Sequence, residues 1–161
     1  MARCYIDTSF LYVHLREAEA GADSAVTAWR DSVALELGDD AGVASGLVLD
    51  ELAYRMILAW LRDDGDGDPL TTFRRSTSAV MGRMHSRLGR LWKAIDTLGL
   101  QLAITDRGVT HWAMELMSDP GLAPRNAFHA AHALDCGCDV IVSSDRGYDR
   151  LSELRRLGPG R

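Results

Sequence analysis

Three acidic side chains and one carboxamide stand where the strands of a parallel sheet would end or where the adjoining helices would begin. Asp7 ends a short segment with strand character, and Asp145 follows the apolar run 140–142. Glu51 lies about one turn into the helix that follows a second short strand, and Asn126 begins the helix that precedes Asp145. If the strands are parallel and adjacent, the four side chains project above one edge of the sheet. Open α/β sheets bind ligands at that edge.

Carboxylates gathered this closely repel one another and raise one another's pKa, so such a group requires a cation. Oxygen ligands favour Mg²⁺ or Mn²⁺ over softer metals. A carboxylate-held Mg²⁺ with open positions suits phosphate chemistry, because it binds a phosphoryl oxygen and activates a bound water. Taken singly, each residue has an ordinary interpretation as a helix cap, a solvated helix residue or a turn residue. The combination predicts a metal site.

The elements that would position these residues alternate between strand and helix, which predicts an α/β fold with a mostly parallel sheet. Strands are expected over residues 3–7, 43–45, 100–104 and 140–142, with a short edge strand at 155–157. Helices are expected from Thr8 or Ser9 onward, and over 22–37, 47–61, most of 70–98, the segment after Asp106, and 126–136. Residues 62–69 are rich in turn formers and predict a loop. No internal linker or repeat interrupts the chain, so residues 1–161 are expected to form one domain.

The composition is that of an ordinary globular protein, with 47% hydrophobic and 25% charged residues. No apolar run approaches the roughly 20 residues that a membrane span needs. The start, MARCYIDTSF, lacks the pattern of a signal peptide, so we expect a cytoplasmic protein with no membrane segment. The cysteines at positions 4, 136 and 138 lack the spacing of a disulfide framework or zinc site, and are interpreted as small buried hydrophobes.

The charge is unevenly distributed along the chain. The net charge of −5 argues against a simple basic coat for nucleic acid. Between residues 73 and 93, however, there is no acid, and the basic residues are Arg74, Arg75, Arg83, Arg87, Arg90 and Lys93. This segment could contact a polyanion, and a solvated helix face is the equally weighted alternative.

Other α/β functions with an acidic strand end fit poorly. A phosphoacceptor domain needs an acidic pair after its first strand and a late lysine, whereas Asp7 is followed by Thr8 and Ser9 and the only lysine is Lys93. A haloacid-dehalogenase-type phosphatase needs Asp-x-Asp, and position 9 is serine. A dinucleotide-binding fold needs a glycine-rich turn after the first strand, which is missing.

The chain resembles the PIN-domain family and, within it, the VapC-type toxins of bacterial toxin–antitoxin pairs. The matching segments are YIDTSFL at 5–11, LVLDEL at 47–52, PRNAFHAAHAL at 124–134 and DVIVSSDRGYDRL at 139–151. The first and last segments together are fairly specific, whereas LVLDEL alone is weak. From about 61 to 104 the similarity is limited to length and helical character.

The resemblance implies a three-layer α/β/α fold with a short, mostly parallel sheet. It implies a Mg²⁺- or Mn²⁺-dependent endoribonuclease that hydrolyses RNA phosphodiester bonds with a metal-activated water. It also implies a homodimer and a cognate antitoxin that occupies the site. The catalytic and metal-binding residues carried over from the family are Asp7, Glu51, Asn126 and Asp145.

Further roles follow from the same resemblance. Thr8, Ser9 and Ser144, together with Arg146, would be polar helpers near the metal or the phosphate, and Tyr148 takes the place of an aromatic residue that usually follows the last acid. His129 matches a frequent histidine and is interpreted as structural, because it would face the core or the sheet; His132 has a weaker claim. The candidate contacts with the RNA backbone come instead from the basic segment between residues 73 and 93, and they are Arg74, Arg75, Arg83 and Arg87.

The family usually has aspartate at the position of Asn126. A carboxamide can bind Mg²⁺ through its oxygen but brings no charge, so metal affinity should fall. Three explanations stay open: a natural variant of weaker activity, a substitution introduced to silence a toxic enzyme, or a natural non-catalytic member that binds RNA or a protein partner. Asp50 is a rival to Glu51, about 100° away on the helix, and Asp149 is a further acid near the rim.

Overall fold

A parallel sheet of five short strands forms the centre of the molecule. The computed structural model describes residues 2–20 and 23–160. The strand order is β3-β2-β1-β4-β5, and every pairing is parallel. The strands are β1 (Cys4–Ile6), β2 (Val43–Ser45), β3 (Gln101–Ala103), β4 (Val140–Val142) and β5 (Arg155–Leu157). All carboxyl ends therefore lie along one edge, with β1 in the middle and β2 and β4 on either side.

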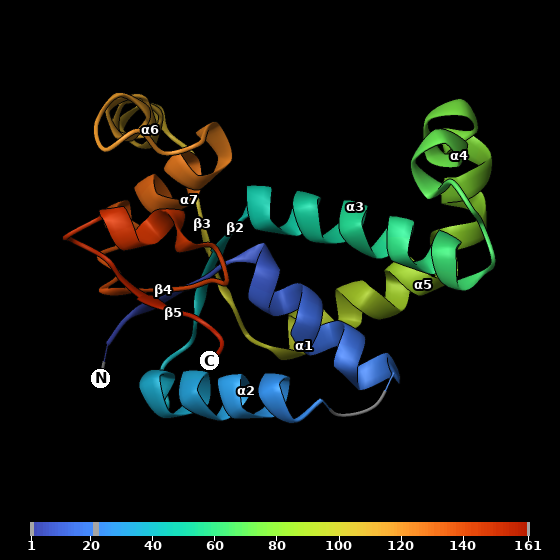
Figure 1. Ribbon diagram of the computed structural model, residues 1–161, viewed down its shortest axis with the longest axis horizontal. Helices are drawn as coiled ribbons and strands as arrows, with labels where there is room; N and C mark the ends of the chain where they lie inside the picture. The colour runs from blue at the N-terminus through green and yellow to red at the C-terminus, as the bar shows by residue number, and fades with distance from the viewer. Residues whose placement is uncertain (1, 21–22, 161) are drawn as a thin grey trace.

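Helices follow or precede each strand, as the alternating sequence pattern predicts (Figure 1). They are α1 (Thr8–Ala20), α2 (Ser24–Leu37), α3 (Gly46–Asp63), α4 (Pro69–Arg75), α5 (Thr77–Thr97), α6 (Arg107–Ser118), α7 (Pro124–Asp135) and the 3₁₀ helix η1 (Arg146–Arg150).

Helices cover both faces of the sheet. On one face, the ring of Tyr5 in β1 contacts the imidazoles of His129 and His132 in α7. On the other, Trp29 of α2 donates a hydrogen bond to the main-chain carbonyl of Leu157 in β5. α7 and α2 accordingly lie on opposite sides of the sheet (Figure 1). The predicted three-layer α/β/α fold with a short parallel sheet is confirmed.

Helices α3, α4 and α5 form an arm that extends away from the sheet. α3 starts at the end of β2, α4 lies at its far end, and α5 leads back toward β3 (Figure 1). At the far end, the guanidinium of Arg87 pairs with both carboxylate oxygens of Asp64, at 2.8 and 3.0 Å. The four arginines expected to contact RNA lie in α4 and α5, on this arm.

Two helical regions differ from the prediction. The helical region 70–98 is divided at Ser76, whose φ of −135° and ψ of 38° leave the helical range. α3 continues to Asp63, so the start of the expected loop is helical. The expected start of the second helix, Ala22, lies outside the described residues. As expected, Asp106 caps α6 by accepting from the Val109 N–H.

Gly137 marks the turn between α7 and β4. Its φ of +64° is in the left-handed region, which glycine adopts without steric cost. The turn carries the chain back to the first residue of β4, which pairs with Cys4 of β1. Cys4 and Cys138 are buried as free thiols, and burial raises the pKa of Cys4 to about 11, in keeping with a packing role. Among the helices of the described segments, none combines the length and apolar character needed to cross a bilayer.

Candidate active site

A cavity of about 370 Å³ opens at the carboxyl edge of the sheet. It is formed by the start of α1, the first turns of α3 and α7, and the loop after β4. Its lining residues are Asp7, Thr8, Ser9, Glu51, Tyr54, Arg55, Arg125, Asn126, His129, Ser144 and Asp145. The four residues predicted to bind metal are therefore brought together, from four separate segments of the chain.

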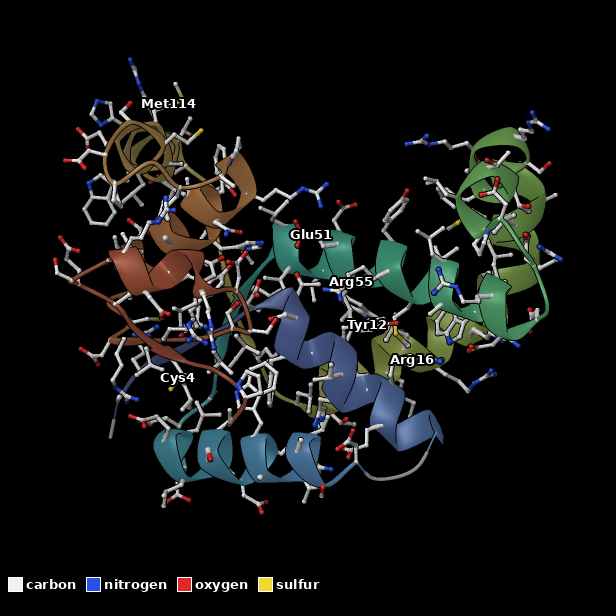
Figure 2. The ribbon with its side chains drawn as sticks, in the orientation of Figure 1. Cys4, Tyr12, Arg16, Glu51, Arg55 and Met114 are labelled. Atoms are coloured by element: carbon white, nitrogen blue, oxygen red, sulfur yellow. The ribbon has the colours of Figure 1, made fainter. Side chains whose placement is uncertain are left out.

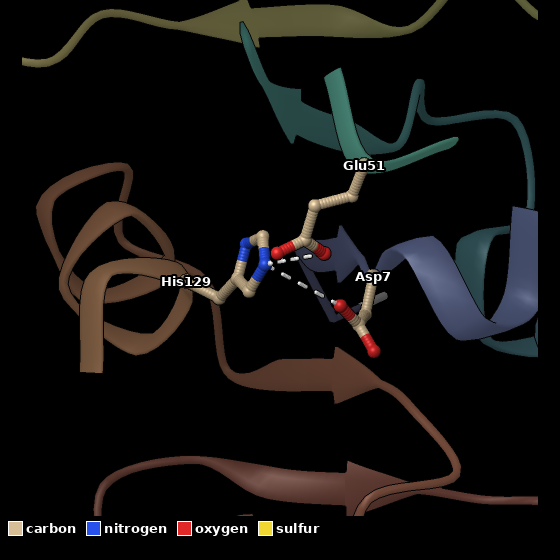
Figure 3. A group of neighbouring side chains, drawn as sticks. All are labelled: Asp7, Glu51 and His129. Carbon is tan, nitrogen blue, oxygen red and sulfur yellow. Dashed lines mark hydrogen bonds and ion pairs between the residues drawn. The ribbon is translucent and has the colours of Figure 1, made fainter. Parts of the chain in front are cut away.

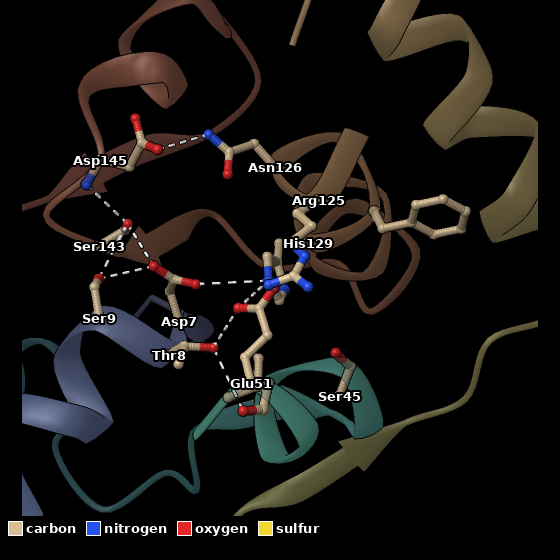
Figure 4. A network of polar contacts seen from close by, with 12 residues as sticks. Asp7, Thr8, Ser9, Ser45, Glu51, Arg125, Asn126, His129, Ser143 and Asp145 are labelled. Carbon is tan, nitrogen blue, oxygen red and sulfur yellow. Dashed lines mark hydrogen bonds and ion pairs between the residues drawn. The ribbon is translucent and has the colours of Figure 1, made fainter. Parts of the chain in front are cut away.

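Asp7 is the most firmly held acid of the cavity. Its main-chain N–H continues the β1–β4 ladder by donating to Val142, and its carbonyl accepts the first hydrogen bonds of α1. The side chain is buried, with a residue exposure of 7%. Its Oδ2 accepts from Ser9 Oγ at 2.8 Å and from Ser143 Oγ at 2.7 Å (Figure 4). Two short hydroxyl contacts thus fix one carboxylate oxygen and leave the other directed at the cavity.

Glu51 reaches the same point from the second turn of α3. Its Oε2 accepts from Thr8 Oγ1 at 2.9 Å and lies 3.4 Å from His129 Nε2. Burial raises the pKa of this carboxyl, but the contacts with His129 and Thr8 and the positive charge of Arg125 outweigh it, and the pKa is lowered overall. Asp50, the rival acid, is exposed and does not line the cavity.

Asn126 and Asp145 face each other across the other side of the cavity. The Asn126 amide donates from Nδ2 to Asp145 Oδ2 at 2.8 Å (Figure 4). The second oxygen of Asp145 accepts from the Gly147 N–H at 2.7 Å and so caps η1. Asp145 is exposed, in contrast to Asp7. On this side of the site, the carboxylate of Asp145 is therefore already hydrogen-bonded to a neutral donor, the amide of Asn126.

His129 is buried, with 2% exposure, as the sequence predicts, but its imidazole also faces the acids. Nε2 lies 3.8 Å from Asp7 Oδ1 as well as 3.4 Å from Glu51 Oε2 (Figure 3). Ligand atoms of these three residues lie within 4.8 Å of one another, a spacing that could hold a metal ion. The sequence contains a signal for this position, because His129 lies three residues after Asn126 and shares its helix face.

Comparison with known proteins identifies the fold family. The family model for the PIN domain matches residues 4–154. The chain belongs to the PIN-domain family. No match was found among curated proteins.

Two solved structures resemble this PIN domain over nearly its whole length. A chain of the crystal structure of VapBC2 from Rickettsia felis, bound to a DNA fragment from their promoter, is 15% identical with a TM-score of 0.55 and 98% of each chain covered. A chain of VapBC-1 from nontypeable Haemophilus influenzae is 12% identical with a TM-score of 0.48 and 96% of each chain covered. The first similarity supports the fold and, at this identity, nothing finer.

The expected polar helpers divide into two groups within this PIN domain. Thr8, Ser9 and Ser144 line the cavity, and Ser144 donates its main-chain N–H to Ser9 Oγ at 3.0 Å. Arg146 is exposed outside the cavity lining, and so are Arg74, Arg75 and Arg83 of the arm; Arg87 is half-buried outside it. Asp149 pairs with Arg156 rather than joining the site. Tyr148 is buried and does not line the cavity.

Four residues of the site were not anticipated from the sequence, and one of them, Tyr54, lines the cavity beside Arg55. Ser143, buried at the end of β4, holds Asp7 and also accepts from the Asp145 N–H at 3.0 Å. Arg55, one turn after Glu51 on α3, lies with its guanidinium 4.4 Å from the centre of the Tyr12 ring (Figure 2). Arg125 directly precedes Asn126, and its Nη1 is 3.0 Å from Glu51 Oε1.

The donor set of this PIN domain fits a hard divalent cation. Glu51 Oε1 is buried and accepts no hydrogen bond from any described residue, so its contact with Arg125 is an ion pair without hydrogen-bond geometry. A buried carboxylate oxygen without a donor is costly unless a cation compensates it. Asp7 and Glu51 offer oxygen ligands of the kind that Mg²⁺ and Mn²⁺ prefer. Asp145 supplies a further carboxylate in the same cavity.

Proposed function

We propose that this PIN domain is a Mg²⁺- or Mn²⁺-dependent endoribonuclease of the VapC toxin type. The observation that carries the proposal is the meeting of Asp7, Glu51 and Asp145 in one cavity, with a buried oxygen of Glu51 that accepts no hydrogen bond from the described part of the chain. Family membership supports a nuclease. The sequence motifs around these acids support the VapC type.

The residues of the site have distinct roles under this proposal. Asp7 and Glu51 would hold the cation, together with Asp145 and the carboxamide oxygen of Asn126, which line the same cavity. When bound, the ion supplies an activated water and neutralises the charge of the scissile phosphate. Arg55 and Arg125 line the cavity beside Glu51 and are placed to attract the phosphates that flank the cleaved bond.

The partners follow from the same proposal. The substrate is RNA, and a cognate antitoxin occupies the site when the toxin is inhibited. The active form is a homodimer in the cytoplasm. The fold similarity to a chain of VapBC2 is compatible with an antitoxin partner. The cavity presents both acids and arginines to such a partner.

A second candidate, a PIN domain that binds RNA or a protein partner without cleaving, is favoured by Asn126. Its amide already donates to Asp145, so the pair holds one charge rather than two. A cation bound between them would lose part of the attraction that two carboxylates provide.

The deciding experiment is cleavage of a mixed pool of structured RNAs by this protein and by Asn126→Asp, each with Mg²⁺, with Mn²⁺ and with EDTA. We expect the aspartate form to cut only with metal and the asparagine form to be slow or silent. Asn126→Asp combined with Glu51→Gln is the matched control. It has the same total charge as the unaltered protein, with the carboxylate at position 126 instead of position 51. If neither form cuts and calorimetry detects no Mg²⁺ binding, the nuclease is refuted and the binding role stands.

A further inference from the structure

We propose that His129 is a positioning residue rather than a metal ligand. In this assignment the buried hydroxyls of Ser45 and Tyr5 hold His129 as the neutral tautomer with hydrogen on Nε2. That hydrogen then points at Glu51 and Asp7 and keeps the two carboxylates together. The tautomer stands on the polar contacts alone, whereas its effect on metal binding rests on the proposed function.

The first argument comes from the buried end of the contact chain. Ser45 Oγ lies 2.7 Å from Tyr5 OH, and Tyr5 OH lies 3.0 Å from His129 Nδ1. Ser45 and Tyr5 have no exposed surface, and Tyr5 is the only hydrogen-bond partner of the Ser45 side chain among the described residues. A buried hydroxyl hydrogen left without an acceptor costs about 1–3 kcal/mol, so Ser45 donates to Tyr5.

The direction of the second hydrogen bond then follows. A tyrosine hydroxyl carries one hydrogen. Since Tyr5 accepts from Ser45, its own hydrogen is directed at His129 Nδ1. That nitrogen accepts only when it carries no hydrogen, and in a neutral imidazole the hydrogen is then on Nε2.

The second argument comes from the cavity end and is independent of the first. Nε2 faces Glu51 Oε2 at 3.4 Å and Asp7 Oδ1 at 3.8 Å (Figure 3). A bare Nε2 lone pair would face two negatively charged oxygens, whereas an N–H is attracted by both. The hydroxyl pair below and the carboxylates above therefore select the same tautomer.

The consequence is that neither imidazole nitrogen offers a lone pair to a cation. Nδ1 is occupied by Tyr5, and Nε2 carries the hydrogen. Although the spacing of His129 and the two acids could accommodate an ion, the ligands that remain are oxygens. An oxygen-only set favours Mg²⁺ and Mn²⁺ over metals that prefer imidazole. Removing a hydrogen bond that orients a metal ligand typically weakens metal binding by about 10–100-fold.

The tautomer is tested by nitrogen NMR of the protein with isotope-labelled histidine at neutral pH. We expect the pattern of a neutral ring with hydrogen on Nε2, unchanged when Mg²⁺ is added. Ser45→Ala should keep this pattern, because Tyr5 then has Nδ1 as its only partner. Tyr5→Phe should lose it and give a mixture. Tyr148→Phe is the matched control, since it removes a buried hydroxyl that has no hydrogen-bond partner among the described residues and should change nothing.

Two NMR results for the unaltered protein would overturn the assignment. They are a neutral ring with hydrogen on Nδ1 and a doubly protonated ring. If only the Ser45→Ala variant shows hydrogen on Nε2, then Tyr5 donates to Ser45 in the native protein and turns to His129 only when Ser45 is removed, which also overturns the assignment. Thermal unfolding of each variant checks that it is folded.

Pulsed EPR with Mn²⁺ alone tests the role at the metal. We expect Mn²⁺ to bind without coupling to an imidazole nitrogen, and Tyr5→Phe to bind it about 10-fold more weakly. His129→Gln, which keeps an N–H donor of similar reach, should retain more affinity than His129→Leu. Nitrogen coupling that disappears in His129→Gln would overturn our inference while leaving the nuclease intact. If Mn²⁺ fails to bind although NMR gives the expected tautomer, the proposed function fails and only the hydrogen-bonded chain remains.

Discussion

The two sides of the cavity hold their acids in different ways. On the Asp7–Glu51 side, both carboxylates are largely buried and are fixed by hydroxyls and by His129. On the opposite side, Asp145 is exposed and its partner is the amide of Asn126. The first side retains a buried negative charge that lacks a full set of donors. On the second side, both oxygens of Asp145 already accept hydrogen bonds from the protein.

This difference indicates which side of the cavity needs a bound cation to compensate its negative charge. Buried charge is tolerated only when it is compensated. On the Asp7–Glu51 side the compensation comes from Arg125, whose side chain is largely exposed. On the other side, an aspartate in place of Asn126 would add a second negative charge beside Asp145, which would also need a cation. The predictions below test the contrast, beginning with the side that should matter most.

Removing the charge of Glu51 should have the largest effect. Glu51→Gln is expected to slow metal-dependent cleavage by about 10³-fold when introduced into Asn126→Asp, because the lost negative charge removes about 4 kcal/mol of stabilisation. Single-turnover cleavage at saturating Mn²⁺ measures this effect. The matched control is Asp50→Asn, the neighbouring acid that lies outside the cavity. An equal loss in Asp50→Asn would mean that the wrong acid of the pair has been assigned.

Asn126→Asp should make the second side resemble the first. The Asn126–Asp145 contact of 2.8 Å would become a contact between two carboxylates, which raises the pKa of one of them and destabilises the metal-free protein. We expect a lower unfolding temperature without metal, restored by Mg²⁺, and Mn²⁺ affinity about 10-fold higher, worth about 1.4 kcal/mol. Calorimetry and thermal unfolding measure both. Asn126→Ala, which loses the hydrogen bond without adding charge, should show no such gain in affinity.

The sequence predicted the position of the acids better than their surroundings. Asp7 and Asp145 were placed correctly at one sheet edge, because a strand end followed by a helix start fixes the direction of the backbone. The partners were missed because they depend on register. Ser143 reaches Asp7 only because Ile6 pairs with Val142 across β1 and β4, and no local pattern specifies that pairing.

The fold shows the same division between local and long-range information. The alternating pattern was sufficient for the sheet and its helices. The break at Ser76 was not visible, because the apolar spacing continues on both sides of it. The alternating run at 100–104 predicted a strand, and β3 forms there at one edge of the sheet, where Leu102 and Ile104 are 51% and 80% exposed. The other edge is β5, as the sequence predicted. The edge position of β3 depends on the order of all five strands.

Thr8→Val tests how the Asp7–Glu51 side is held. The hydroxyl donates to Glu51 at 2.9 Å, so its loss should destabilise the protein by about 1 kcal/mol at pH 7. Because the folded-state pKa of Glu51 lies below the usual 4.5, its stabilising contribution is full above that pH and is lost as the pH falls through the lowered pKa. The cost of Thr8→Val should therefore shrink below pH 4.5.

Urea unfolding across pH measures this dependence. Thr110→Val is the control, since the Thr110 hydroxyl donates only to the main-chain carbonyl of Asp106 and its loss should cost the same at every pH. A cost of Thr8→Val that does not vary with pH would show that Thr8 supports the packing of α1 on α3 rather than the charge of Glu51.

The smallest effect is expected far from the cavity, in the arm. If Arg74, Arg75 and Arg83 contact RNA phosphates, changing all three to glutamine should weaken binding and reduce the salt slope by about 2, at roughly 0.7 for each contact with a single strand. Arg87→Gln should change the slope less, because this side chain already pairs with Asp64. Titrations of RNA at several salt concentrations measure the slope.

The change in slope should be the same whether position 126 is asparagine or aspartate, since none of these arginines lines the cavity. A slope change that appears only with aspartate would mean that the arm and the charge on the second side of the site act together on one RNA path.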